Sequence, residues 1–237
     1  MNTLAVGGLG GQWFLAILMI VLVSWFLFRY LIPQSWKEWR AAGILQAFII
    51  ALYAEMYGFP LTIYILTAYF GVDIPWLHMR GHLWSSLLGL GDIGAMAEMV
   101  LGYAIIFAGI GLLAAGWRQV YKAQKQDKLV TDGLYRYVRH PQYTGIFIAV
   151  LGQLLHWPTL LTLVLAPLIV LMYWRLAVKE EREMLKKFGA EYAAYTAKTP
   201  RFIPKGNAWR SLMRATKETE EEQDAAARPV QDGRGDL

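Results

Sequence analysis

The stretch RHPQYTGIFIAVLGQLLHWP, residues 139–158, decides how this chain is built, because it joins a basic loop directly to an apolar segment. The residue before a proline avoids the helical region, whereas proline itself suits the first helical turn. The chain is therefore predicted to run extended through His140 and to become helical from Pro141. Such a helix start carries partial positive charge and unpaired N–H groups, which suit an anionic group of a cofactor.

Apolar runs of membrane-spanning length surround this stretch. The chain has 237 residues, of which 56% are hydrophobic and only 17% are charged, as in an integral membrane protein. Gln12–Ile32 would extend about 31 Å as a helix, close to the roughly 30 Å of a bilayer's hydrocarbon core. Further runs cover Ala42–Phe70, Ile93–Gly116, Tyr143–His156 and Thr159–Val178. Tyr143–His156 would extend only about 21 Å.

These runs predict an all-α polytopic membrane protein with about five transmembrane helices. The last two, Tyr143–Val178, are expected to form a helical hairpin that turns at Trp157-Pro158, either spanning or re-entrant, followed by a cytosolic helical segment. Of the 23 Lys and Arg residues, none precedes Arg29, six lie between Trp117 and His140, and thirteen lie from Arg175 onward. By the positive-inside tendency the N-terminus is outside and the C-terminus is cytoplasmic. The net charge of +5 then reflects orientation and requires no nucleic-acid partner.

Two groups of polar residues are predicted to meet at the cytoplasmic end of the hairpin. The first is Gly133-Leu134-Tyr135 followed by Arg139-His140-Pro141-x-Tyr143-x-Gly145. The second contains Glu180, Glu181, Met184, Leu185, Phe188, Gly189, Tyr192, Tyr195 and Thr199-Pro200-Arg201-Phe202. The chain has no cysteine, which excludes a disulfide framework, a thiol nucleophile and thiolate metal ligands.

Together these groups, roughly Leu129–Lys205, resemble the C-terminal catalytic region of the isoprenylcysteine carboxyl methyltransferase and phospholipid methyltransferase superfamily. The Arg-His-Pro-x-Tyr-x-Gly motif is complete, and the paired glutamates, Phe-Gly, Tyr and Pro-Arg follow in order. Met184 stands where the family has leucine, and Arg175 is displaced by one position from the family's arginine. The resemblance implies that residues 129–205 are a catalytic, cofactor-binding region. Residues 1–128 are expected to be N-terminal transmembrane helices with a variable acceptor-side region, and the polar composition of residues 206–237 predicts a disordered tail.

The resemblance implies methyl transfer from S-adenosyl-L-methionine to a lipophilic acceptor, without a metal. The expected catalytic residues are Arg139, His140, Arg175 and Glu181. The expected cofactor-binding residues are Tyr135, Arg139, His140, Pro141, Tyr143, Gly145, Glu180, Glu181 and Tyr192. Arginine, imidazole and the helix start suit the cofactor's carboxylate, a glutamate suits its ammonium and sulfonium charges, and the tyrosines suit its adenine or ribose. Successive helical residues point about 100° apart, so one glutamate is expected to bind cofactor and the other to hold a nearby arginine.

Other ionisable residues have plainer interpretations beside functional ones. Arg139 and His140 could be interfacial anchors, and the tyrosines could simply pack. Glu55 and Glu98 lie inside apolar runs, where they are either substrate-side residues or protonated or paired structural residues. His78 and His82 have the spacing of a metal pair but no third ligand, so no metal site is expected. Gly102, Gly109 and Gly111 are predicted to allow close helix packing.

Three functions fit the sequence. The first is membrane methyl transfer with S-adenosyl-L-methionine to a lipophilic acceptor. The second is an NADPH-dependent membrane reductase of the sterol reductase type, which resembles this superfamily in its C-terminal helices. The third is a non-enzymatic transporter or scaffold. The protein is expected in the plasma (inner) membrane if bacterial and in the endoplasmic reticulum if eukaryotic, and the sequence leaves the acceptor and the oligomeric state open.

Overall fold

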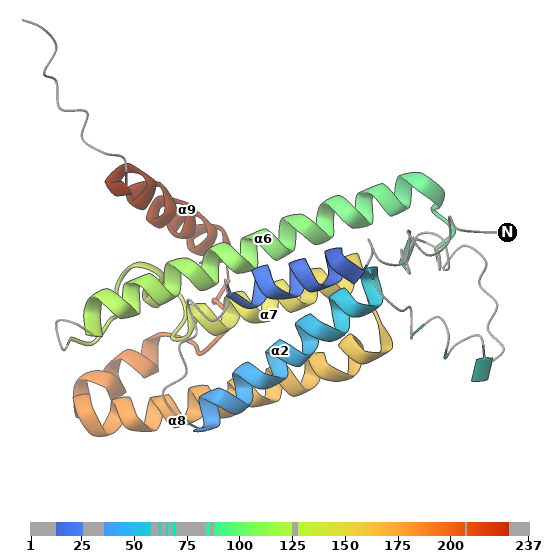
Figure 1. Cartoon of the computed structure of the whole chain (residues 1–237). Helices are drawn as coiled ribbons and strands as arrows, with labels where there is room; N and C mark the ends of the chain where they lie inside the picture. The colour runs from blue at the N-terminus through green and yellow to red at the C-terminus, as the bar shows by residue number, and fades with distance from the viewer. Residues whose placement is uncertain are drawn as a thin grey trace, which may run out of the picture. The chain divides into compact units, whose positions relative to one another are not determined.

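The structure, a computed structural model, describes residues 13–25, 36–57, 62, 65, 68–69, 84–85, 88–124, 128–206 and 208–227. Within these residues every regular element is a helix, which confirms the predicted all-α class. The elements are α2 (Trp36–Tyr57), α6 (Gly91–Gln124), the 3-10 helix η1 (Gly133–Arg136), α7 (Pro141–His156), α8 (Leu160–Lys198) and α9 (Ala208–Ala227) (Figure 1). A further apolar helix covers Trp13–Trp25.

Two of the described helices, α6 and α8, are long and apolar enough to cross a membrane. In their most apolar 18-residue windows only 39% and 33% of the residues, respectively, are buried inside the protein. A core helix of a soluble protein would be largely buried, whereas these helices expose apolar side chains such as Phe107 and Val164. The membrane character expected from the sequence is thus supported, while five crossings and the outward N-terminus stay predictions.

The chain forms two compact units. The first consists of residues 1–107 and 147–186, and the second of residues 108–146 and 187–237. The expected catalytic region, residues 129–205, contributes to both units. Each unit is described below by itself.

Helices α6 and α7 approach backbone to backbone because glycines stand at the crossing points. In the first unit, a Cβ added to Gly152 would lie 2.8 Å from the Ile106 nitrogen and 3.0 Å from the Gly102 carbonyl oxygen. In the second unit, a Cβ on Gly145 would lie 2.5 Å from the Gly109 carbonyl oxygen. The close packing predicted for Gly102 and Gly109 is therefore confirmed, as is typical of small residues at helix interfaces in membranes.

A tight turn joins α7 to α8 in the first unit. Helix α7 ends at His156 and α8 begins at Leu160, so Trp157-Pro158 forms the turn, as the sequence predicts. The Thr159 hydroxyl accepts a hydrogen bond from the Thr162 backbone N–H at 3.1 Å, which caps the start of α8. The Trp157-Pro158 pair and the capping Thr159 therefore mark this turn in the sequence.

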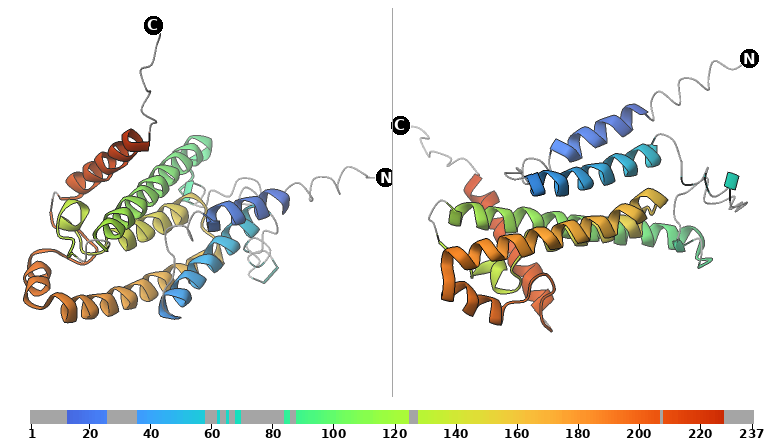
Figure 2. Two further views of the ribbon diagram at one scale, coloured as in Figure 1. Left: turned by 60° about the vertical axis from the view of Figure 1, so that its left-hand side comes forward. Right: turned by 90° about the horizontal axis from the view of Figure 1, so that it is seen from below.

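The C-terminal segment corrects the prediction of a disordered tail from residue 206. Ala208–Ala227 form α9, which packs against η1 within the second unit (Figures 1 and 2). Leu212 is 0% and Thr216 3% exposed, and the two lie four residues apart on one side of the helix. The acidic composition suggested disorder, but a narrow buried stripe of this kind suffices to hold the helix in place.

Replacing Leu212 with alanine is expected to loosen α9, because it removes a fully buried side chain and leaves a cavity. Such truncations cost about 2–5 kcal/mol of stability. Limited proteolysis should show faster cleavage between residues 206 and 227 in Leu212→Ala. The matched control is Arg214→Ala, which alters an exposed residue of the same helix. Equal cleavage rates in the two variants would contradict the packing of α9.

Candidate functional site

The first motif group meets the end of the second, residues 200–202, in the second unit through backbone hydrogen bonds. The Arg139 N–H donates to the Pro200 carbonyl at 2.9 Å, and the His140 N–H donates to the Arg201 carbonyl at 3.1 Å. The Thr144 hydroxyl lies 3.0 Å from the Phe202 carbonyl and 3.1 Å from the His140 carbonyl. We call this pairing of residues 139–144 with residues 200–202 the motif junction. It joins segments about sixty residues apart in the chain.

The start of α7 offers fewer backbone donors than the sequence suggests. The helix begins at Pro141, as predicted, and proline has no N–H. The Tyr143 and Thr144 N–H groups both donate to the His140 carbonyl, at 3.1 and 3.0 Å. The N–H groups of Arg139 and His140 are used in the motif junction. The sequence predicted unpaired N–H groups here that could bind a cofactor, but the chain itself satisfies four of these N–H groups. Anion binding at this helix start would therefore depend mainly on side chains.

His140 is buried and contacts two aromatic rings. Its side chain is 5% exposed, and its ring stacks on Tyr143 with a centroid distance of 5.4 Å and an interplanar angle of 6°. The Phe202 ring lies 5.8 Å away at 47°. Contact with these two rings restricts the rotation of the imidazole.

The tyrosines predicted to hold cofactor also have structural bonds. The Tyr135 hydroxyl lies 2.9 Å from the Gln142 side-chain oxygen and 3.2 Å from the Gly116 carbonyl. The Tyr195 hydroxyl donates to the Tyr135 carbonyl at 2.6 Å. Tyr192 is 5% exposed, and its ring lies 5.9 Å from that of Tyr195. These bonds connect η1 to α6, α7 and the end of α8 within the second unit, whereas cofactor contacts by the tyrosines stay predictions.

Sequence reasoning missed Gln142 and Thr144, the two unspecified positions of the motif. Both are buried, and both make hydrogen bonds that hold other parts of the motif. The available signal was the presence of two polar residues in the first turn of an otherwise apolar helix. Gly145, the last motif position, lies against α6 and has a clear packing role.

Replacing Thr144 with valine is expected to loosen the motif junction while preserving the side-chain shape. Loss of a buried side-chain hydrogen bond costs about 1–2 kcal/mol. Hydrogen exchange should become faster at the Arg139 and His140 amides, which donate across the junction. The matched control is Thr196→Val, because the Thr196 hydroxyl donates a solvent-exposed hydrogen bond to the Ala193 carbonyl within its own helix. Unchanged exchange in Thr144→Val would contradict its bridging role.

The Phe188-Gly189 pair marks a break in α8. Gly189 has φ 52° and ψ −122°, a conformation that residues with a side chain rarely adopt. No atom lies within 4 Å of an added Cβ, so the requirement for glycine is conformational and not steric. Figure 2 shows the bend in the orange part of α8. The break turns Tyr192–Thr199 back toward the segment that forms the motif junction.

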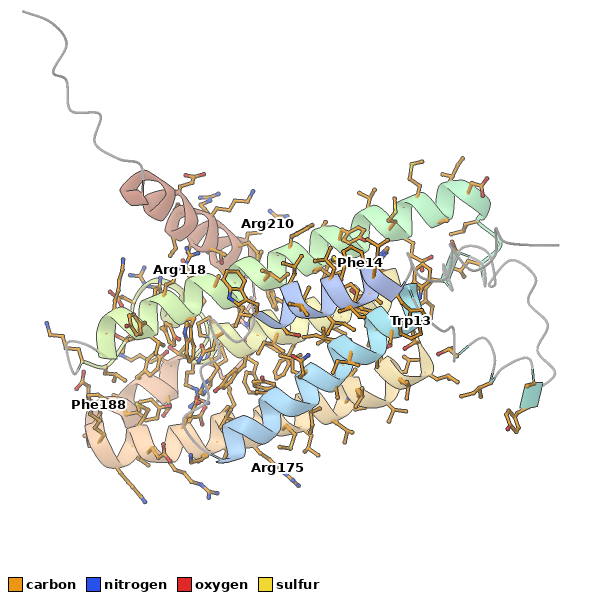
Figure 3. The ribbon with its side chains drawn as sticks, in the orientation of Figure 1. Trp13, Phe14, Arg118, Arg175, Phe188 and Arg210 are labelled. Carbon is orange, nitrogen blue, oxygen red and sulfur yellow. The ribbon has the colours of Figure 1, made fainter. Side chains whose placement is uncertain are left out.

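The remaining expected site residues, Arg175, Glu180 and Glu181, lie on α8 in the first unit. Glu180 is on the side of the helix that buries Tyr173. Glu181 points about 100° away from Glu180 around the helix. Arg175 is exposed (Figure 3). The two glutamates thus point in different directions from α8. Their roles toward the cofactor and toward a nearby arginine stay predictions.

Of the two glutamates inside apolar runs, the structure describes the side chain of Glu98 but not that of Glu55. Glu98 is 6% exposed, and its carboxylate accepts a hydrogen bond from the Ser85 N–H at 2.9 Å. This supports a structural role, which the sequence left open beside a substrate-side role. The backbone of Glu55 belongs to α2, but its side chain lies outside the described part of the structure, as do His78 and His82. Within the described residues no cluster of three potential metal ligands occurs.

Comparison with known proteins supports the resemblance noted in the sequence. A family model described as phospholipid methyltransferase matches residues 93–191. The protein-S-isoprenylcysteine O-methyltransferase of Schizosaccharomyces pombe is 39% identical over 84 residues, 35% of this chain and 36% of that protein. The protein-S-isoprenylcysteine O-methyltransferase B of Arabidopsis thaliana is 28% identical over 129 residues, 53% of this chain and 62% of that protein.

A bacterial relative carries a different kind of name. The cobalt-zinc-cadmium resistance protein CzcN of Cupriavidus metallidurans is 34% identical over 106 residues, 43% of this chain and 49% of that protein. The chain thus spans less than two thirds of the length of each of these three relatives. No solved structure matches the chain. The resemblance to the isoprenylcysteine and phospholipid methyltransferase superfamily is confirmed for the region that contains α6, α7 and most of α8.

Proposed function

We propose that this chain, whose residues 93–191 match the phospholipid methyltransferase family, transfers a methyl group from S-adenosyl-L-methionine to a lipophilic acceptor. The single observation that carries the proposal is the motif junction. It holds the Arg-His-Pro motif and the Pro-Arg motif together by backbone hydrogen bonds, with a buried imidazole that contacts two aromatic rings. The names of two relatives make the carboxylate of a prenylated cysteine the first candidate acceptor.

The side chains of the second unit fit one end of the cofactor. S-adenosyl-L-methionine supplies a methyl group already activated by a positively charged sulfur. We assign its carboxylate to Arg139 and His140, since a guanidinium and an imidazole make strong charge-assisted hydrogen bonds to such a group. Glu180 or Glu181 remains the predicted partner of the ammonium group. The buried aromatic surroundings of His140 exclude water, which strengthens its interaction with an anion.

Positioning would supply most of the rate acceleration in this reaction. A carboxylate acceptor attacks the methyl carbon directly and needs no base, so the protein has only to align the two groups. A thiol or amine acceptor must lose a proton, and His140 is the proposed base. We also propose that the motif junction lies on the cytoplasmic side, since the basic loop and the basic C-terminal region flank it.

Incubating the purified protein with methyl-deuterated cofactor tests the proposal. The acceptor panel contains a prenylated cysteine, a phospholipid amine, a small apolar thiol and native membrane extract. Mass spectrometry should find deuterated methyl groups on one acceptor class, and none with protein denatured beforehand. S-adenosylhomocysteine should raise the melting temperature of the protein, because a ligand of the native state stabilises it. Stabilisation by NADPH and none by S-adenosylhomocysteine would overturn the proposal in favour of a reductase.

A further inference from the structure

One side of α8 changes character at Trp174. Toward the N-terminal end of the helix, Val164, Leu168 and Leu171 are 63%, 41% and 45% exposed. Their spacing of four and three residues places them on a single side of the helix. Trp174 follows and is itself 51% exposed. An exposed apolar stripe that ends at a tryptophan is the pattern of a helix leaving the hydrocarbon core at the membrane interface.

Four cations continue the same side of the helix beyond Trp174. Arg175, Lys179, Arg182 and Lys186 are spaced by four, three and four residues, so their side chains lie in one row. With Trp174, Val178 and Glu183, they line an open groove of about 520 Å³. We call this row and its groove the cationic groove. All of its residues belong to the first unit.

The charges of the cationic groove are unbalanced. Like charges three or four residues apart on a helix repel one another. One acid, Glu183, lines the groove, and its carboxylate lies 3.5 Å from the Lys179 ammonium. The opposite side of α8 buries Tyr173 and Ala177, which are 2% and 0% exposed, and Glu180 belongs to that side. The groove therefore faces away from the packed side of the helix, and a bound anion would relieve the repulsion within it.

We propose that the cationic groove binds the phosphate of an anionic phospholipid from the surrounding bilayer. The exposed stripe of Val164, Leu168 and Leu171 would lie along the acyl chains, Trp174 would lie at the interface, and the cations would reach the headgroup. Basic residues next to a membrane helix attract anionic lipids in this way. The site places Trp174 at the membrane boundary, and it gives Arg175 a role in lipid binding beside the predicted catalytic one.

Lipid selectivity, measured by electron paramagnetic resonance, tests this site. The full-length protein is placed in phosphatidylcholine vesicles with spin-labelled phosphatidylglycerol or spin-labelled phosphatidylcholine. The wild-type protein should immobilise the anionic lipid preferentially. The double variant Arg182→Gln, Lys186→Gln should reduce this preference about 25-fold, since each of the two basic residues near an anionic lipid contributes an attraction worth about fivefold. About 0.5 M NaCl should weaken the wild-type preference by screening.

The matched control is Arg214→Gln, Lys217→Gln, which removes the same charge from exposed positions on α9. It should retain the wild-type preference. An unchanged preference in the groove variant, or an equal loss in the control, would overturn the proposal. In neutral detergent, the melting temperature is also compared with inorganic phosphate and with phosphatidylglycerol. If both raise it equally, and both effects are lost in the groove variant, the groove binds free phosphate and the lipid proposal is overturned. These measurements do not use methyl transfer, so their outcome is independent of the proposed function.

Discussion

Replacing His140 with phenylalanine is expected to lower kcat/KM for methyl transfer at least 100-fold while the protein remains folded. Phenylalanine preserves the stacking on Tyr143 and the packing against Phe202, but it has no nitrogen atom to bind an anion or accept a proton. Loss of a contact that positions the cofactor can cost about 100-fold in rate, because small misplacements of the reacting groups have effects of that size. The rate should be measured with labelled cofactor, and the binding of S-adenosylhomocysteine by calorimetry.

The matched control for this variant is His156→Phe, the same change at another buried histidine of α7 that lies outside the motif. It is expected to keep kcat/KM within a few-fold of the wild-type value per folded molecule. Comparable activity in His140→Phe and wild-type protein would contradict the assignment of His140. A weaker affinity for S-adenosylhomocysteine with unchanged kcat would place His140 in cofactor binding alone.

Replacing Gly145 with alanine is expected to destabilise the protein by about 3 kcal/mol, near the upper end of over-packing costs. The new Cβ would lie 2.5 Å from both the Gly109 carbonyl oxygen and the Leu113 nitrogen. These are backbone atoms of α6, so no side-chain rotation can relieve the clash, and the two helices must separate. The melting temperature should fall by roughly 10 °C.

Gly43→Ala is the matched control for Gly145→Ala. Gly43 lies within α2, and no atom lies within 4 Å of its added Cβ. Alanine favours helix over glycine by about 1 kcal/mol, so this variant should be as stable as the wild-type protein or slightly more stable. A melting temperature of Gly145→Ala within 2 °C of wild type would contradict the close approach of α6 and α7 at this position.

Local sequence signals predicted the elements that depend on neighbouring residues. Pro141 marked the start of α7, Trp157-Pro158 marked the turn after it, and the apolar runs marked the helices. Disorder was predicted wrongly for Ala208–Ala227, because the charged composition of this segment outweighed a short apolar stripe. Leu212 becomes informative only in the folded protein, where it is fully buried and its helix packs against η1. In an acidic segment, so short an apolar stripe does not by itself predict a packed helix.

The sequence alone determined that the chain is helical and apolar, where α7 begins, and which residues form the two motif groups, because backbone preference and hydrophobicity act over a few neighbouring residues. Only the tertiary structure decided that Pro200 and Arg201 take up the N–H groups of Arg139 and His140, and that Gly145 faces α6. Hydrogen bonds between distant segments must satisfy buried polar groups, and partners of this kind are set by the folded backbone and not by local composition.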